Sequence, residues 1–446
     1  QVVETHLERI EKYNPVLNAF ITVCAEDALV AAHAAEEEIT GGLYRGPLHG
    51  VPFGVKDIID TAEVRTTHGS SFFRENIPSE DAECVRRLKE AGAILIGKCN
   101  THEFATASTT KNPHYGAGRN PWDPSRVPGG SSGGSGAAAA AYLSPFALGS
   151  ETGGSTRGPA AVCGVMGLKP TYGRISIRGV FPHTPTMDHV GLLARTVRDC
   201  AIVLQGIAGY DALDMASADV LVPDFSARLE DGIKGMRLGL CPDLVCIEID
   251  AAVMEAFERA VELIHGLGAR LETLRFPHIE KMVQVRQTIV DAELIEVHRE
   301  RFTTHPEGYG EDVRARLERA SRVTLDEYVR ARREAVLLQR AMVELFRPVE
   351  AILLPGFPVV AAPVDTTMAT LNGKEVPYSF LGSPLTGPHT MTGFPAMAVP
   401  TGFSPEGLPV SLQIVTSPWE EGRIFRIASA YEKATPEIRG RRPTIG

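Results

Sequence analysis

Residues 129–159 read GGSSGGSGAAAAAYLSPFALGSETGGSTRGP and contain two turns rich in glycine and serine. The first turn, residues 129–136, has the composition of a flexible linker. Its flanks argue against a linker, because Val127-Pro128 precedes it and five alanines follow it, as expected of buried elements. A buried glycine-rich turn lets backbone N–H groups approach a substrate closely. We therefore interpret Ala137 to Leu148 as buried helix and strand between two functional turns.

The second turn, residues 149–159, again places a serine behind paired glycines. Ser131 and Ser155 are 24 residues apart, which leaves room for one helix and one short strand to bring the second turn back beside the first. A phosphate-binding loop would need Lys-Ser or Lys-Thr after the glycines, and neither follows. The residues alone therefore leave two hypotheses open. One is a proton relay between the two serines, and the other is a nucleophile elbow.

The nucleophile elbow would use the G-x-S-x-G pattern centred on Ser131 or the next frame centred on Ser132. It also needs an acid and a histidine further along the chain. The candidates have no distinctive sequence context; they are Asp188, His183, His189 and His389.

Lys56 lies in a mostly apolar, strand-like segment, GVPFGVKDIID, residues 50–60. Most lysines are exposed cations, but burial in a strand would lower the pKa of this one toward the range in which it acts as a base. Asp57 is an unfavourable partner, because adjacent strand residues point to opposite faces. Lys56 is therefore a candidate base.

Three motifs together resemble the amidase signature family: VPFGVKD at residues 51–57, VPGGSSGGSG at 127–136 and GSETGGSTR at 149–157. The resemblance continues at residues 159–161, 167–174 and 393–396 and covers most of the chain except its middle. It implies a serine amidohydrolase that needs neither metal nor cofactor. The implied fold is α/β, with a central mixed β-sheet covered by helices on both faces.

The resemblance also implies residue roles. Lys56 would be the base, Ser131 a bridging serine that follows a cis peptide bond, and Ser155 the nucleophile that forms an acyl-enzyme. The implied oxyanion hole consists of the backbone N–H groups of Thr152, Gly153, Gly154 and Ser155. We expect Ser132 to support Ser131 by hydrogen bonding. Arg157 either orders the turn or contacts the substrate, or it forms a structural ion pair with an acid such as Asp188, and we favour the structural role.

The N-terminal two hundred residues also resemble the A subunit of glutamyl-tRNA amidotransferase, which releases ammonia from glutamine with the same relay. In that protein an acid about ten positions before a Gly-hydrophobic-Pro turn anchors the substrate amino group, and Ser383 stands there in this chain. Apolar neighbours, among them Leu385 and Met391, favour an acyl or aryl pocket. We therefore predict a stand-alone amidase acting on a small apolar or aryl amide, or on a urea, carbamate or ester. The alternatives are an α/β-hydrolase-type esterase that uses Ser131 and a glutamine-hydrolysing member of a tRNA-dependent amidotransferase complex.

Helix-like and strand-like segments alternate along the chain, as at residues 82–91 and 93–97 and again at 251–267 and 269–276, which indicates layered α/β structure. We expect one domain spanning residues 1–446, with core motifs at 50–190. The charged middle, about residues 223–347, is expected to form a helical insertion that shapes the substrate pocket, and its last helix opens with a capping box of Thr324 and Glu327.

The composition limits the remaining classes. Of the 446 residues 43% are hydrophobic and 22% charged, with no apolar run long enough to span a membrane. The net charge of −10, without a large basic cluster, argues against direct binding of nucleic acid. Seven scattered cysteines and the absence of H-E-x-x-H argue against disulfides and metal, and fit a cytoplasmic protein. The first residues show no signal-peptide pattern. Because the chain begins with Gln1 and not with Met, we expect its natural start to lie further upstream. The sequence is compatible with a homodimer.

Overall fold

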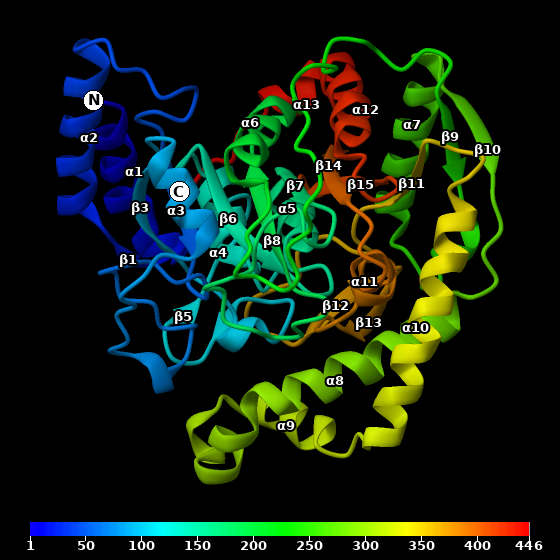
Figure 1. Cartoon of the computed structure of the whole chain (residues 1–446). Coiled ribbons are helices and arrows are strands. Elements are labelled where there is room, and N and C mark those ends of the chain that lie inside the picture. The colour runs from blue at the N-terminus through cyan, green and yellow to red at the C-terminus, as the bar shows by residue number, and fades with distance from the viewer. Residues whose placement is uncertain (446) are drawn as a thin grey trace.

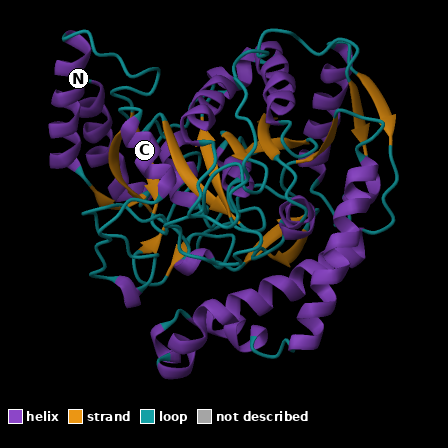
Figure 2. Cartoon of the chain, viewed as in Figure 1, coloured by secondary structure: helices purple, strands orange, loops and turns teal. Residues whose placement is uncertain are grey.

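A mixed sheet of 11 strands forms the centre of the computed structural model, which describes residues 1–445 (Figures 1 and 2). Its strands, in spatial order, are β1 (Phe20–Val23), β3 (Ile94–Cys99), β2 (Pro52–Lys56), β6 (Phe146–Glu151), β8 (His189–Ala194), β7 (Met166–Lys169), β14 (Ala396–Phe403), β15 (Pro409–Val415), β11 (Ala351–Pro355), β9 (Arg237–Leu240) and β10 (Arg270–Thr273). Strands from the beginning and the end of the chain thus share one sheet. Two small hairpins lie outside it, β4 (Lys111–Asn112) with β5 (Gly116–Ala117), and β12 (Met368–Leu371) with β13 (Lys374–Pro377).

Both faces of the sheet are covered by helices, because its central strands carry apolar residues on both sides. Leu192 of β8 packs into one core while its neighbour Leu193 packs into another. The first core includes residues of α3 (Glu83–Glu90), α6 (Val197–Ile207), α7 (Ala251–Gly266) and α12 (Glu421–Ala434). The second includes residues of α4 (Gly133–Ala140) and α5 (Arg157–Cys163). The predicted mixed sheet with helices on both faces is confirmed.

The remaining helices lie toward the edges and ends of the sheet. At the N-terminal edge α1 (Val2–Leu17) and α2 (Ala25–Thr40) pack beside β1 and β3 (Figure 1). Near the C-terminus α13 (Pro436–Gly440) follows α12. None of the helices in residues 1–445 combines the length and the apolar character needed to cross a membrane.

The middle of the chain contains more than helices. It forms α8 (Ile279–Thr304), α9 (Glu311–Ala320) and α10 (Leu325–Leu345), which extend below the sheet in Figure 1. Thr324 and Glu327 form the predicted capping box at the start of α10. The same region also supplies β9 and β10, which continue the main sheet beyond β11. Residues 223–347 therefore contribute the last two strands of the sheet, of which β10 forms the edge, as well as a helical layer.

Parallel pairing brings the two predicted turns and the lysine together. β2 pairs in parallel with β6, with Val55 opposite Leu148, so both strands end at the same edge of the sheet. Lys56 ends β2, and the turn that carries Ser155 follows β6. The turn that carries Ser131 precedes α4, which packs on β6.

Candidate active site

Lys56 is fully buried and faces two serine hydroxyls. Its Nζ lies 2.6 Å from Ser131 Oγ and 2.8 Å from Ser150 Oγ. Burial lowers the pKa of Lys56 well below its usual value, while the negative charges of Asp188 and Glu151 oppose that change. A buried lysine with a lowered pKa and a hydroxyl at hydrogen-bond distance can accept a proton.

Ser131 is fully buried and follows a cis peptide bond from Gly130, the geometry that the resemblance implies. There is no room for a side chain at position 130, because a methyl group there would lie 2.3 Å from the backbone nitrogen of Thr109. Among the residues that the structure describes, no histidine side chain bonds to the Ser131 hydroxyl, whose partner is Lys56. His183, His189 and His389 are buried, and the rings of His183 and His189 bond to Thr184 and to the Met187 carbonyl, so the contacts of Ser131 do not fit a nucleophile elbow.

In residues 152–155, called here the Ser155 turn, the carbonyl groups accept hydrogen bonds from the protein, and the N–H groups form none within residues 1–445. The carbonyls of Thr152, Gly153, Gly154 and Ser155 accept hydrogen bonds from Arg286, Thr386, Gly158 and Ser132, respectively. In the described part of the chain no hydrogen bond is formed by the N–H groups of these four residues. Gly153, Gly154 and Ser155 are partly exposed, so a substrate oxygen can reach these donors. Such a set of donors is suited to holding an oxyanion.

The hydroxyl of Ser155 itself forms no hydrogen bond within residues 1–445, so it is free to meet a substrate. The link between the two turns is a backbone hydrogen bond of 3.2 Å from Ser132 N–H to the Ser155 carbonyl. The hydroxyl of Ser132 contacts the backbone of Ser150, donating to its carbonyl and accepting from its N–H group. The expected hydrogen bond from Ser132 to Ser131 is therefore wrong, because Ser132 joins the turn to β6 instead.

Arg157 is completely buried and pairs with Glu151, not with the expected Asp188. Glu151 also accepts hydrogen bonds from the backbone N–H groups of Thr156 and Arg157, at 3.1 and 3.0 Å. Arg157 further donates to Gln413 Oε1 at 2.8 Å. Because Glu151 ends β6 and Arg157 begins α5, this ion pair acts as a clamp that joins the two ends of the Ser155 turn.

Asp188 lies next to the same turn with its carboxylate almost completely buried. It accepts hydrogen bonds from Thr152 Oγ1 and from the N–H groups of His183 and Thr184. Burial raises the pKa of Asp188 to about 6 although these donors oppose the shift. Its charge is one of the two that favour protonated Lys56.

The predicted pocket residues lie on one helix, α11 (Ser383–Met391), but their surroundings are not purely apolar. Leu385 is buried and Met391 is partly buried. Ser383 Oγ accepts a hydrogen bond of 2.9 Å from Arg286 of α8. Arg286 also reaches the carbonyl of Thr152, so a positive charge lies between the pocket helix and the Ser155 turn.

Sequence reasoning missed Ser150 and Arg286. Ser150 could have been found from its place in the GSETGGSTR motif, because parallel pairing of β2 with β6 sets it beside Lys56. The sequence around Arg286 contains no motif that indicates a site residue, because Arg286 is one of several charged residues in a helical segment.

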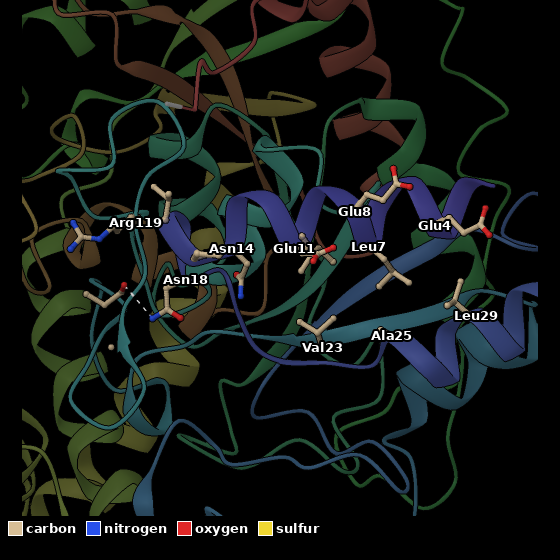
Figure 3. A pocket seen from close by; sticks show the side chains of 15 residues that line it. Glu4, Leu7, Glu8, Glu11, Asn14, Asn18, Val23, Ala25, Leu29 and Arg119 are labelled. Atoms are coloured by element: carbon tan, nitrogen blue, oxygen red, sulfur yellow. Dashed lines mark hydrogen bonds between the residues drawn. The ribbon is translucent and has the colours of Figure 1, made fainter.

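A large pocket of about 990 Å³ lies at the N-terminal edge of the sheet, between α1 and the start of α2 (Figure 3). Three of the residues that line it are acidic: Glu4, Glu8 and Glu11. It contains none of the predicted site residues. Within residues 1–445 no three His, Cys, Asp or Glu side chains are grouped as metal ligands would be.

The chain matches the family model described as Amidase over residues 1–425. It is 37% identical to the A subunit of glutamyl-tRNA(Gln) amidotransferase from Geobacter metallireducens, over 96% of this chain and 92% of that protein. A solved structure described as part of a vestigial protein complex that reveals the origins of an s-triazine catabolic enzyme superposes with a TM-score of 0.93 at 33% identity, covering 97% of this chain and 94% of the other. A crystal structure of an amidase superposes with a TM-score of 0.87 at 34% identity, covering 97% and 95%.

Proposed function

Because the chain belongs to the amidase signature family and is an amidohydrolase, we propose that it cleaves a carboxylic amide through a relay of Ser155, Ser131 and Lys56. The observation that carries this proposal is the arrangement of the Ser155 turn. Its four carbonyls accept hydrogen bonds from the protein, whereas its four N–H groups and the Ser155 hydroxyl form none within residues 1–445. Lys56 and Ser131 lie behind it as a buried base and a bridge.

In the proposed reaction neutral Lys56 accepts the proton of Ser131, Ser131 accepts the proton of Ser155, and Ser155 Oγ attacks the amide carbon. The carbonyl oxygen becomes an oxyanion held by the N–H groups of the turn. Loss of one such donor typically costs about 3 kcal/mol of transition-state stabilisation. The relay then returns a proton to the leaving nitrogen as the C–N bond breaks. Water, deprotonated by the same route, hydrolyses the acyl-enzyme and restores Ser155.

The proposal is tested by three single substitutions, Lys56→Ala, Ser131→Ala and Ser155→Ala. Each is expected to lower kcat by about a thousandfold or more, because residues that act as one unit lose most of the rate individually. Ser226→Ala, which removes an exposed hydroxyl far from the relay in sequence, is the matched control. Hydrolysis that persists in Ser155→Ala would contradict the proposal.

A serine-reactive phosphonate gives a second, independent test. It is expected to add to Ser155, and mass spectrometry of the digested protein would locate the adduct. Labelling of Ser131 in place of Ser155 would support the esterase alternative and would contradict the assigned nucleophile.

For the substrate, we propose a small amide whose acyl part lies against α11, close to Ser383 and the partly buried Met391, whereas Leu385 is buried in a core with Ile249 and Val253. A urea, carbamate or ester would fit the same relay. The second candidate is glutamine hydrolysis within a tRNA-dependent amidotransferase complex, which the 37% identity to an A subunit of such a complex favours. Ammonia release from glutamine, compared with that from simple amides, distinguishes the two.

A further inference from the structure

Arg286 is a buried arginine that forms no ion pair with an acidic residue in the described part of the chain. Only 7% of its surface is exposed, and within the described residues no carboxylate lies within 4 Å of its guanidinium. Its two bonds go to neutral acceptors, the Ser383 hydroxyl and the Thr152 carbonyl. Buried charges in proteins are normally paired, so an arginine without a carboxylate next to the Ser155 turn requires an explanation.

The Arg286 guanidinium has more N–H donors than its two side-chain hydrogen bonds use. It carries five N–H groups, and the two observed bonds use two of them. Nε is buried without a partner and is packed against Gly387, where a methyl group would lie 2.5 Å away. The remaining N–H groups are on Nη1 and Nη2, at the end that faces Ser383 and Gly153. A methyl group on Gly153 would lie 2.1 Å from Nη2, so the guanidinium directly borders the partly exposed turn.

The carboxylates near Arg286 are engaged with other groups, and Asp188 is bonded to Thr152. The charge of Asp291, on the same helix, raises the pKa of both Arg286 and Arg316 of α9, and Asp312 does so for Arg316. The Asp291 carboxylate accepts a hydrogen bond from Gln287. Glu151 is already paired with Arg157. Arg316 is also buried, and its guanidinium lies 4.6 Å from the centre of the Phe380 ring. Burial lowers the pKa of each arginine to about 10, so both remain charged at neutral pH.

We propose that Arg286 binds a carboxylate carried by the substrate, so that this enzyme selects carboxylated amides over neutral ones of the same length. The inference rests on the proposed function, because it places this carboxylate beside the amide that Ser155 attacks. Two adjacent N–H groups on a rigid guanidinium suit the two oxygens of a carboxylate. The ligand would supply the directly bonded carboxylate that Arg286 does not receive from residues 1–445.

The test compares matched substrates. On the acyl side malonamate, succinamate and glutaramate are compared with propionamide, butyramide and valeramide; on the amine side N-acetylglycine is compared with N-ethylacetamide. The wild-type enzyme is expected to prefer the carboxylated member of at least one set by about 10- to 100-fold in kcat/KM. A preference for the neutral member in both sets would overturn the proposal.

Substitution of Arg286 separates binding of the carboxylate from support of the turn. Arg286→Gln removes the contact with the Thr152 carbonyl as well, so activity on all substrates is expected to fall. The decisive readout is the ratio of kcat/KM between carboxylated and neutral members, which should fall about 10- to 100-fold and recover partly in Arg286→Lys. Arg299→Gln, an exposed arginine on the same helix, is the control for the change in net charge. An unchanged ratio in Arg286→Gln would mean that Arg286 is only structural.

Ser383→Asp tests the same inference by placing an internal carboxylate on Arg286. It should lower the preference for carboxylated amides, since the new acid competes for the guanidinium. A preference that is unchanged or higher would count against the proposal.

Binding to Ser155→Ala makes the test independent of turnover. Calorimetry with succinamate, glutaramate and N-acetylglycine is expected to show binding of at least one of them that is lost when Arg286→Gln is added. Absence of such binding overturns the carboxylate site even if the wild-type enzyme hydrolyses neutral amides. Conversely, carboxylate-dependent binding together with activity that survives Ser155→Ala would refute the relay and leave the binding site in place.

Discussion

Lys56 is the residue whose charge is expected to set the dependence of rate on pH. Only the neutral amine can accept a proton, so kcat/KM should rise with pH as Lys56 loses its proton. Burial lowers its pKa, and the rise should therefore be centred well below the usual pKa of lysine. Asp188 raises the pKa of Lys56, and Asp188→Asn is therefore expected to move the rise to lower pH.

The measurement is kcat/KM against pH for the wild-type enzyme and Asp188→Asn. The Asn oxygen can accept the two hydrogen bonds that Asp188 receives from the N–H groups of His183 and Thr184, and the Asn NH2 group can donate to Thr152 Oγ1, so the substitution removes the charge and reverses one hydrogen bond. Because Asp188 has a pKa of about 6, the difference should be visible above that pH, where the wild-type carboxylate is charged. A rise displaced to higher pH would contradict the assignment of Lys56 as the base.

At the scale of elements, the buried pair of Glu151 and Arg157 joins the end of β6 to the start of α5. Glu151→Gln or Arg157→Met alone leaves a buried charge without its partner and is expected to lower the free energy of unfolding by about 3–5 kcal/mol. The double variant should lose clearly less than the sum of the two single losses, because neither charge then remains. Urea denaturation followed by circular dichroism measures all three variants. Additive losses would show that the pair does not act as a clamp.

Elements defined by local pattern were predictable from the sequence, and contacts between distant segments were not. The helix expected at 82–91 is α3, and the capping box at Thr324 is present, because both depend on neighbouring residues. The motifs likewise placed Lys56 beside Ser131, although 75 residues separate them, since the resemblance supplied the pairing.

For side chains whose partner no motif indicated, the predicted hydrogen-bond partner was wrong or no partner was predicted. Arg157 pairs with Glu151 and Ser132 bonds to the backbone of Ser150, and either residue could equally have satisfied other nearby groups. Arg286 reaches Thr152 across 134 residues, a distance over which helix periodicity carries no information. Which polar partner a buried side chain meets is decided by tertiary packing, and only the folded structure reveals it.

At the scale of the whole molecule, residues 223–347 belong to the sheet as well as to the helical layer. β9 pairs with β11, so removal of this region would expose a buried strand edge and would also remove Arg286. A chain in which residues 223–347 are replaced by a short glycine-serine linker is therefore expected to aggregate, because unpaired edges associate. Size-exclusion chromatography of this variant beside the full chain is the measurement. A soluble, folded product would instead support a separable insertion.

The charge around Arg286 also predicts how the complete, isolated chain discriminates glutamine from glutaramate. The two molecules share a primary amide and a carboxylate, and they differ by the ammonium group of glutamine. Position 383 is a serine, and the surrounding arginines would repel the ammonium group. The isolated chain should therefore release ammonia from glutaramate with a kcat/KM at least about tenfold higher, a factor that corresponds to about 1.4 kcal/mol. Ser383→Asp should narrow the difference, since it supplies a counter-charge. Preference of the wild-type chain for glutamine would instead favour a role within an amidotransferase complex, because an ammonium group would then be accepted without an acid at position 383.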